Sequence, residues 1–321
     1  MDFFLFILSM TFAVVPLVLA LWLVWWLDRY DREPPWLVGL SFSWGGIGGV
    51  IFALIGSSIV MFPIELVASP AVADSISATF VAPLVEEPAK ALILLFIVFS
   101  RHFDNTTDGF VYGAACGLGF GVTENFMYFW SVGATGDMDA YVGTVVVRTL
   151  YSAMMHAAAS STIGAALGFA KFRGIGVKLI VPLFGLGVAM SIHALWNGLL
   201  TAEGIVGAGG ALAVLNFLLF PLEFLTLFII FQACLWSEKS MIRRELEGEV
   251  PAAHLPFLAS YLARNKKSWL PPGVPHDAYI VAATNLAFRK HQVRHARNKK
   301  FYEQEVGKLR SEVQGLLSKA A

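Results

Sequence analysis

The sequence predicts an all-α fold: a polytopic membrane bundle of about seven transmembrane helices, followed by a small helical cytoplasmic tail. Hydrophobic residues make up 57% of the 321 residues and charged residues only 14%, whereas a soluble domain carries about 25% charged residues. The mean hydropathy is +0.66. Apolar residues gather in long runs, and the chain becomes rich in charge only after residue 236. These observations indicate an integral membrane protein.

Seven apolar runs are long enough to cross a bilayer, which takes about 20 residues of helix. They cover about residues 3–27, 37–60, 78–99, 109–133, 141–169, 178–202 and 211–236. The first run has no basic segment before it and no small-residue cleavage site after it, which predicts a retained span rather than a signal peptide. The interrupted segment 64–77 is predicted to lie at the outer surface or to re-enter the membrane.

The loops between these runs alternate in basic charge, and this alternation predicts the orientation. Loop 28–36 carries Arg29 and Arg32, and the loops 100–108 and 170–178 also contain Lys or Arg. The other loops, 61–77, 134–140 and 203–210, contain neither residue type. Basic loops remain in the cytoplasm. The N-terminus is therefore predicted to lie outside and the C-terminus in the cytoplasm.

The composition predicts two domains, a transmembrane bundle over residues 1–236 and a basic helical tail over 237–321. The tail holds 15 Lys/Arg against 8 Asp/Glu, which leaves 8 basic and 15 acidic residues in the bundle. This excess fits the cytoplasmic bias, with contact to anionic lipid as a weaker interpretation. The two cysteines, Cys116 and Cys234, lie in apolar runs, which argues against a disulfide framework or a cysteine metal site.

Ionisable residues inside the apolar runs are the candidate functional groups, because charge at membrane depth is costly and marks function. They are Glu86, Glu87, Lys90, Glu124, Arg148, His156 and His193. Counted from the outer ends of their spans at 1.5 Å per residue, Glu86, Glu124 and His193 lie about 12–14 Å deep. His156 is deeper on this count, and Arg148 is shallower. One polar layer in the outer half of the bilayer is therefore predicted.

Helical spacing refines this layer. Glu86 and Lys90 are four residues apart and are predicted to neutralise each other, which leaves Glu87 available for another partner. His193 and Asn197 share a helix face in the same way. Arg148 is predicted to be the counter-ion of one of the glutamates.

Carboxylates and imidazoles in a low-dielectric cavity can activate water, with an imidazole and an amide stabilising an oxyanion. Two histidines and a carboxylate are also a common catalytic zinc set. No H-E-x-x-H or G-x-S-x-G motif is present. The chemistry alone leaves peptide hydrolysis and proton- or ion-coupled transport equally open, and a non-enzymatic sensor or scaffold is a third alternative.

The stretch from Glu86 to Lys90 resembles the E-E-x-x-K motif of the PrsW family of intramembrane proteases, which are relatives of the CAAX-processing proteases. The following stretch, 108–125, is similar to a second motif of that family, with Phe120 and Glu124 at its centre. His156 matches a family histidine, and the residues from His193 to Asn197 match an H-x-x-x-N element. The resemblance covers about residues 28–200 and leaves out the tail.

The resemblance implies an intramembrane endopeptidase of the bacterial cytoplasmic membrane. The implied substrate is a single-span membrane protein, such as an anti-sigma factor, cut near the extracytoplasmic side. No nucleic-acid partner is expected. The expected catalytic residues are Glu86, Glu87, Glu124, His156, His193 and Asn197.

Within this set, Glu86 or Glu87 is expected to activate water, and His193 and Asn197 are expected to hold the oxyanion. Lys90 and Arg148 are expected to balance charge. The cofactor is left open, with Zn²⁺ as an alternative whose ligands are Glu87, Glu124, His156 and His193.

Overall fold

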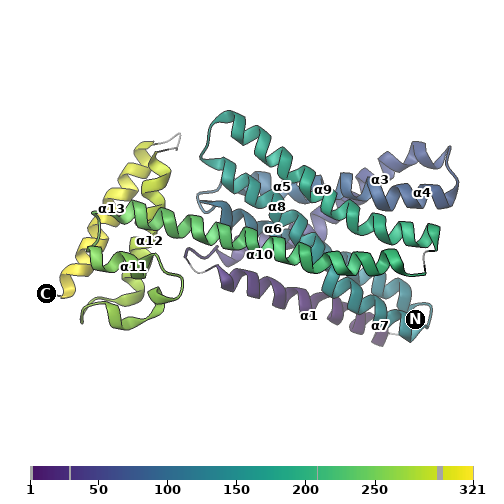
Figure 1. Cartoon of the computed structure of the whole chain (residues 1–321), viewed down its shortest axis with the longest axis horizontal. Helices are drawn as coiled ribbons and strands as arrows, with labels where there is room; N and C mark the ends of the chain where they lie inside the picture. Colours follow the sequence, from purple (N-terminus) through teal and green to yellow (C-terminus); the bar gives the residue numbers. More distant parts are fainter. Residues whose placement is uncertain (1–2, 29, 208, 295–298, 321) are drawn as a thin grey trace. The chain divides into compact units, whose positions relative to one another are not determined.

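The computed structural model describes residues 3–28, 30–207, 209–294 and 299–320, and the secondary-structure elements it describes there are all helical (Figure 1). Arg29, one of the basic residues used for the orientation, lies outside the described residues. The chain divides into two compact units. The bundle unit comprises Met1–Leu27 and Glu33–Ile229, and the C-terminal unit comprises Asp28–Arg32 and Ile230–Ala321.

The helices follow the predicted apolar runs closely, although several runs are built from more than one element. In the bundle unit they are α1 (Phe3–Leu27), α2 (Pro35–Ser43), η1 (Trp44–Gly49), α3 (Val50–Glu65), α4 (Pro70–Ile76), η2 (Ser77–Val81), α5 (Ala82–Ile97), α6 (Thr106–Gly133), α7 (Met138–Val147), η3 (Arg148–Ser152), α8 (Ala153–Lys171) and α9 (Ile175–Val206). Helix α10 (Ala211–Leu246) begins in the bundle unit and ends in the C-terminal unit.

Among the described residues, four helical stretches are long and apolar enough to cross a membrane. They are Phe3–Leu27, Pro35–Glu65, Ile175–Val206 and Ala211–Leu246. The other predicted spans correspond to α4–η2–α5, α6 and α7–η3–α8, which carry Glu86, Glu87, Lys90, Glu124, Arg148 and His156. The chain is therefore a multi-pass helical membrane protein, and the count of seven spans stays a prediction.

Helices α6 and α8 lie in the middle of the bundle unit, beside α1 and α9 (Figure 1). Gly109, Gly113 and Gly117 form a stripe along α6 that faces α8. A methyl group at any of them would overlap a backbone oxygen of α8, at Gly164, Ser160 and His156 respectively. Small residues let membrane helices approach this closely. The stripe therefore fixes α8, and the backbone of His156 with it, against α6.

In the described part of the bundle there are three π-helical segments, and two of them come directly before helices that carry predicted site residues. The segment η2 leads into α5, and η3 leads into α8. A π-helical turn is wider than an α-helical one and is often found at functional sites. Each segment thus changes the direction in which the following side chains point.

The C-terminal unit has a hydrophobic core of its own. It is built from the end of α10, α11 (Leu255–Leu258), α12 (His276–Val293) and α13 (Lys299–Leu317). Tyr30, from the loop after α1, belongs to this core and donates a hydrogen bond to the Ala259 carbonyl at 3.1 Å. Arg310 donates two bonds of 2.7 Å to Glu249 and holds the pKa of that carboxyl at about 2. The unit is thus tied together by packing and by a paired charge.

The sequence places its domain boundary where the last apolar run ends, at residue 236. The compact units divide inside α10, between Ile229 and Ile230, and the C-terminal unit also takes in Asp28–Arg32. Composition marks the end of an apolar run, whereas contacts decide which residues form a core. The assignment of the bundle to the membrane and of the tail to the cytoplasm remains a proposal.

Candidate active site

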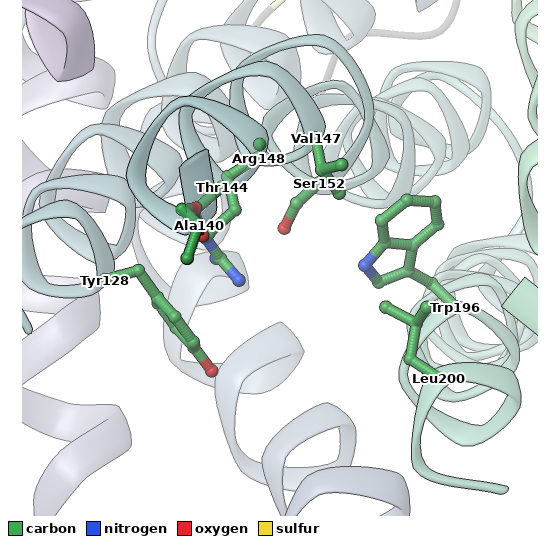
Figure 2. A pocket seen from close by; sticks show the side chains of 9 residues that line it. Tyr128, Ala140, Thr144, Val147, Arg148, Ser152, Trp196 and Leu200 are labelled. Carbon is green, nitrogen blue, oxygen red and sulfur yellow. Dashed lines mark hydrogen bonds between the residues drawn. The ribbon is translucent and has the colours of Figure 1, made fainter. Parts of the chain in front are cut away.

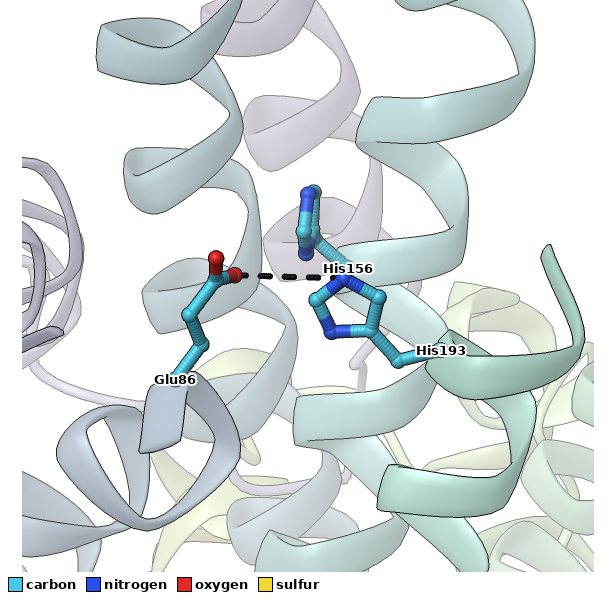
Figure 3. Close-up of side chains that lie close together, drawn as sticks. All are labelled: Glu86, His156 and His193. Carbon is cyan, nitrogen blue, oxygen red and sulfur yellow. Dashed lines mark ion pairs between the residues drawn. The ribbon is translucent and has the colours of Figure 1, made fainter. Parts of the chain in front are cut away.

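Four α-helices and the segment η3, which carries Arg148, bring the predicted ionisable residues together. Helix α5 carries Glu86, Glu87 and Lys90, α6 carries Glu124, α8 carries His156, and α9 carries His193. Figure 3 shows Glu86, His156 and His193 pointing toward one another from three of these helices. The two imidazole rings lie 4.9 Å apart, at an angle of 87°.

Lys90 lies at the centre of the cluster and is fully buried. Its Nζ atom is 2.7 Å from Glu87 Oε1, 2.9 Å from His156 Nδ1 and 3.7 Å from Glu86 Oε2. The ammonium also lies 4.1 Å from the centre of the Phe120 ring. The sequence pairs Lys90 with Glu86, but the closer partner is Glu87. A buried charge of this kind needs such partners, because it has lost its hydration.

The bonds of Lys90 and the glutamates define the tautomers of the two histidines. An ammonium group only donates, so His156 Nδ1 accepts from Lys90 and its Nε2–H donates to Glu124 Oε2 at 2.5 Å. His193 Nδ1–H donates to Glu87 Oε1 at 2.8 Å. Its Nε2 atom is left 3.9 Å from Glu86 Oε2.

Glu124 also pairs with Arg148, whose Nη2 atom lies 2.8 Å from Glu124 Oε2. Arg148 Nε donates to Asn125 Oδ1 at 3.2 Å, and Asn125 Nδ2 donates to the Arg148 carbonyl at 3.3 Å. The guanidinium lies 3.7 Å from the centre of the Tyr128 ring. Arg148 is therefore the counter-ion of Glu124 among the three predicted glutamates.

Asn197 lies apart from this network. Its Nδ2 atom donates to the Ala78 carbonyl in η2 at 3.0 Å. In the described part of the chain, no hydrogen bond joins it to the glutamates or histidines. The bond instead connects α9 to the segment that leads into α5.

Two residues not assigned a role from the sequence also belong to the cluster. Phe120 contacts both Lys90 and His156, with its ring 5.2 Å from the His156 ring. Asn125 holds Arg148. Both lie within the stretch 108–125, and their closeness to Glu124 in the sequence is the feature that could have indicated them. An apolar ring and an amide give no chemical reason to single them out.

The donor atoms suit a divalent metal ion. Ligand atoms of Glu86, His156 and His193 all lie within 4.8 Å of one another, and two imidazoles with one carboxylate are a known catalytic zinc set. Glu86 Oε2 is buried without a hydrogen-bond partner, and it faces the free Nε2 of His193. Two acceptors facing each other leave a place for a cation or a water molecule.

The sequence expects Glu87 and Glu124 to be metal ligands together with the two histidines. In the structure these glutamates hydrogen-bond to the imidazoles, Glu87 to His193 and Glu124 to His156. Carboxylates in such positions orient the histidines that bind a metal. With neutral imidazoles, the three glutamates exceed Lys90 and Arg148 by one negative charge, which also favours a cation.

Comparison with known proteins identifies the family. The family model of PrsW family intramembrane metalloproteases matches residues 33–226. Protease PrsW of Geobacillus kaustophilus (strain HTA426) is 30% identical over 183 residues, which cover 55% of this chain and 72% of that protein. Protease PrsW of Clostridioides difficile (strain 630) is 29% identical over 194 residues, which cover 60% of this chain and 78% of that protein.

Protease PrsW of Bacillus subtilis (strain 168) is 30% identical over 176 residues, which cover 54% of this chain and 74% of the relative. No solved structure matches the chain. The residues matched by the family model include every helix that contributes to the cluster. The chain therefore belongs to the PrsW family of intramembrane proteases, and it is a peptide-bond hydrolase of the membrane.

Proposed function

We propose that the chain is an endopeptidase that cuts a single-span membrane protein near the extracytoplasmic side of a bacterial cytoplasmic membrane. The observation that carries the proposal is the convergence of Glu86, His156 and His193, with ligand atoms within 4.8 Å of one another. Carboxylates and imidazoles at such distances can hold a water molecule and accept its proton. Membership of a protease family favours hydrolysis over the transporter and scaffold alternatives.

Glu86 is the better base of the two adjacent glutamates. Oε2 of both glutamates is buried without a hydrogen-bond partner. Glu87 Oε1, however, accepts hydrogen bonds from Lys90 and His193, so that carboxylate is held by two donors, whereas Glu86 faces the Nε2 of His193. Glu86 Oε2 and His193 Nε2 are 3.9 Å apart, so one water molecule can reach both at an ordinary hydrogen-bond distance. As the water oxygen attacks the peptide carbonyl, its proton passes to Glu86 and then to the leaving amine.

The other residues of the cluster position these groups. Glu87 fixes the ring of His193 so that Nε2 faces Glu86, and Glu124 fixes the ring of His156 through its Nε2. Lys90 and Arg148 neutralise the two orienting carboxylates. The sequence assigns the oxyanion to His193 and Asn197. Because Asn197 bonds the Ala78 carbonyl, its part in this proposal is to hold α9 beside η2.

Glu86, His156 and His193 are the residues that would hold a divalent cation such as Zn²⁺. When bound, the ion would supply Lewis-acid polarisation of the scissile carbonyl. Glu86 has two carboxylate oxygens, so ligation by one leaves the other to accept a proton. His156 would have to exchange its bond to Lys90 or Glu124 for ligation.

The side of the membrane on which cleavage occurs follows from the alternation of basic loops. With the N-terminus outside, Glu86, Glu124 and His193 lie about 8–9 residues from the outer ends of their predicted spans, or roughly 12–14 Å deep. A substrate peptide bond would then reach the cluster from the extracytoplasmic half of the bilayer. This supports a single-span protein whose outer end is cut.

The test is the substitution Glu86→Gln, which keeps the size of the side chain and removes the base. We expect the amount of cleaved membrane protein in cells to fall at least about 100-fold, because a general base contributes roughly 10²–10⁴-fold to the rate. The matched control is Glu65→Gln, at an exposed position at the end of α3, which should cleave normally. Full cleavage by a folded Glu86→Gln protein would refute the assigned base.

A further inference from the structure

A cavity of about 450 Å³ lies beside the cluster, between α6, α7, η3 and α9. Figure 2 shows side chains from these elements around it. Its walls are mainly apolar and include Tyr128, Trp196 and Leu200. Pockets that bind small molecules are lined in this way and have volumes of about 300–1,000 Å³. The cavity is therefore large enough for a bulky amino-acid side chain.

The cavity is one helical turn from the two site histidines. Ser152 lies four residues before His156, and Trp196 lies three residues after His193. Residues at these spacings share a helix face. Arg148 also lines the cavity and pairs with Glu124, which holds His156. A group in the cavity is thus next to the place where the peptide bond would be cut.

Two buried hydrogen-bond donors point into the cavity. The hydroxyl of Ser152 and the indole nitrogen of Trp196 face it in Figure 2, and each residue is only 2% exposed. No hydrogen bond of either group occurs within the described part of the chain. Buried polar groups are normally hydrogen-bonded. Donors without partners in an apolar cavity are suited to the carbonyl oxygens of a bound peptide.

We propose that this cavity is the substrate subsite for a large apolar residue next to the cleaved bond. The side chain, of the size of leucine, methionine or phenylalanine, fills the space between Tyr128, Trp196 and Leu200. The main-chain carbonyls of the substrate accept hydrogen bonds from Ser152 Oγ and Trp196 Nε1. The proposal rests on the proposed proteolytic function, which it deepens by giving the protease a preference at the cleaved bond.

Gly143 gives a direct way to fill the cavity. It lines the cavity from α7, and a Cβ atom added there would meet no atom within 4 Å. Gly143→Leu therefore occupies the subsite without displacing the surrounding helices. Gly187→Leu is the matched control, because this glycine on α9 also has open space within 4 Å and does not line the cavity.

The experiment uses the full chain in proteoliposomes and a set of single-span peptides with a leucine–alanine span. After mass spectrometry has located the cleaved bond, the residue on each side of it is changed to alanine, leucine or phenylalanine. We expect the wild-type protein to cut the leucine and phenylalanine peptides faster than the alanine peptide. Gly143→Leu should lower the phenylalanine-to-alanine rate ratio by about 10-fold or more, and Gly187→Leu should leave it unchanged.

A cross-linking measurement separates the subsite from the proteolysis. Gly143→Cys is combined with peptides that each carry one cysteine at a successive position of the span, activated as a mixed disulfide with thiopyridine. Attack by the new thiol forms the protein–peptide disulfide and releases the thiopyridine, and the inactive Glu86→Gln background prevents turnover. The natural Cys116 and Cys234 are buried, so a disulfide to the peptide reports the new thiol. We expect this disulfide to form, and Gly187→Cys to give none.

The outcomes are distinct. An unchanged rate ratio in Gly143→Leu together with no cross-link overturns the subsite and leaves the protease standing, and the cavity would then hold a lipid chain. A cross-link without cleavage by the wild-type protein supports the subsite and refutes the proposed proteolysis. The absence of both cleavage and cross-link refutes both.

Discussion

At the scale of single residues, Lys90 is a buried positive charge whose stability depends on the groups around it. Its ammonium is fully buried, and it contacts Glu86, Glu87 and His156 at once. Removing one partner of a buried ion pair leaves the other charge unpaired, which costs about 3–5 kcal/mol. The side chain is therefore a structural requirement for keeping two adjacent glutamates in one cavity.

The substitution Lys90→Met tests this role, because it keeps the length of the side chain and removes the charge. We expect the free energy of unfolding in detergent micelles to fall by about 3–5 kcal/mol. The double variant Lys90→Met/Glu87→Gln should recover part of this loss and remain inactive. Lys178→Met, at an exposed position on α9, is the control. A Lys90→Met protein as stable as the wild type would contradict the buried ion pair.

At the scale of elements, the position of His156 depends on the contact between α6 and α8. Gly117 faces the backbone of His156, and a methyl group there would overlap its carbonyl oxygen. Phe120 and Glu124 follow on α6 and contact the His156 ring. The glycine brings the two helices together, and the next turns of α6 then hold the imidazole.

The substitution Gly117→Ala should therefore damage the site more than its size suggests. We expect it to force α6 and α8 apart and to lower the free energy of unfolding by about 1–3 kcal/mol, as overpacking does. Cleavage should fall up to about 100-fold, because small displacements of catalytic groups are costly. Gly187→Ala, with open space around it, should change neither the stability nor the cleavage rate. Wild-type behaviour of Gly117→Ala would exclude the close contact.

At the scale of the whole molecule, the sequence predicts the helices and the residues that gather in the site. It predicts less well which of these residues bond to one another. Depth along a helix can be counted, so Glu86, Glu124 and His193 were expected in one layer. Side-chain partners cannot be counted in this way. Glu86 and Glu87 both lie within about one turn of Lys90 on α5, and Glu87 is the nearer carboxylate. These adjacent residues differ by about 100° of helix rotation, and only the packing of α5 decides which carboxylate meets Lys90 and His193.

Two further features could not be derived from sequence patterns. The count from residue 141 places His156 deeper than Glu124, because it assumes that this helical run is regular and begins at the same level as the others. In the structure the π-helical segment η3 interrupts it, and His156 meets Glu124. The place of Tyr30 in the core of the C-terminal unit was also unforeseen, since a short basic loop carries no apolar periodicity that predicts burial.

The last prediction concerns the orientation of the chain in the membrane. This orientation decides from which side a substrate reaches the site. Ala134→Cys lies in a loop without basic residues, whereas Arg101→Cys and Ser311→Cys lie in a basic loop and in the tail. Because basic loops stay in the cytoplasm, a membrane-impermeant thiol reagent should label Ala134→Cys in intact cells. It should label the other two only after the membrane is opened. The natural cysteines are 0% and 4% exposed, so the unmodified protein serves as the unlabelled control. Labelling of Arg101→Cys from outside would reverse the orientation and move the cluster to the cytoplasmic half of the bilayer.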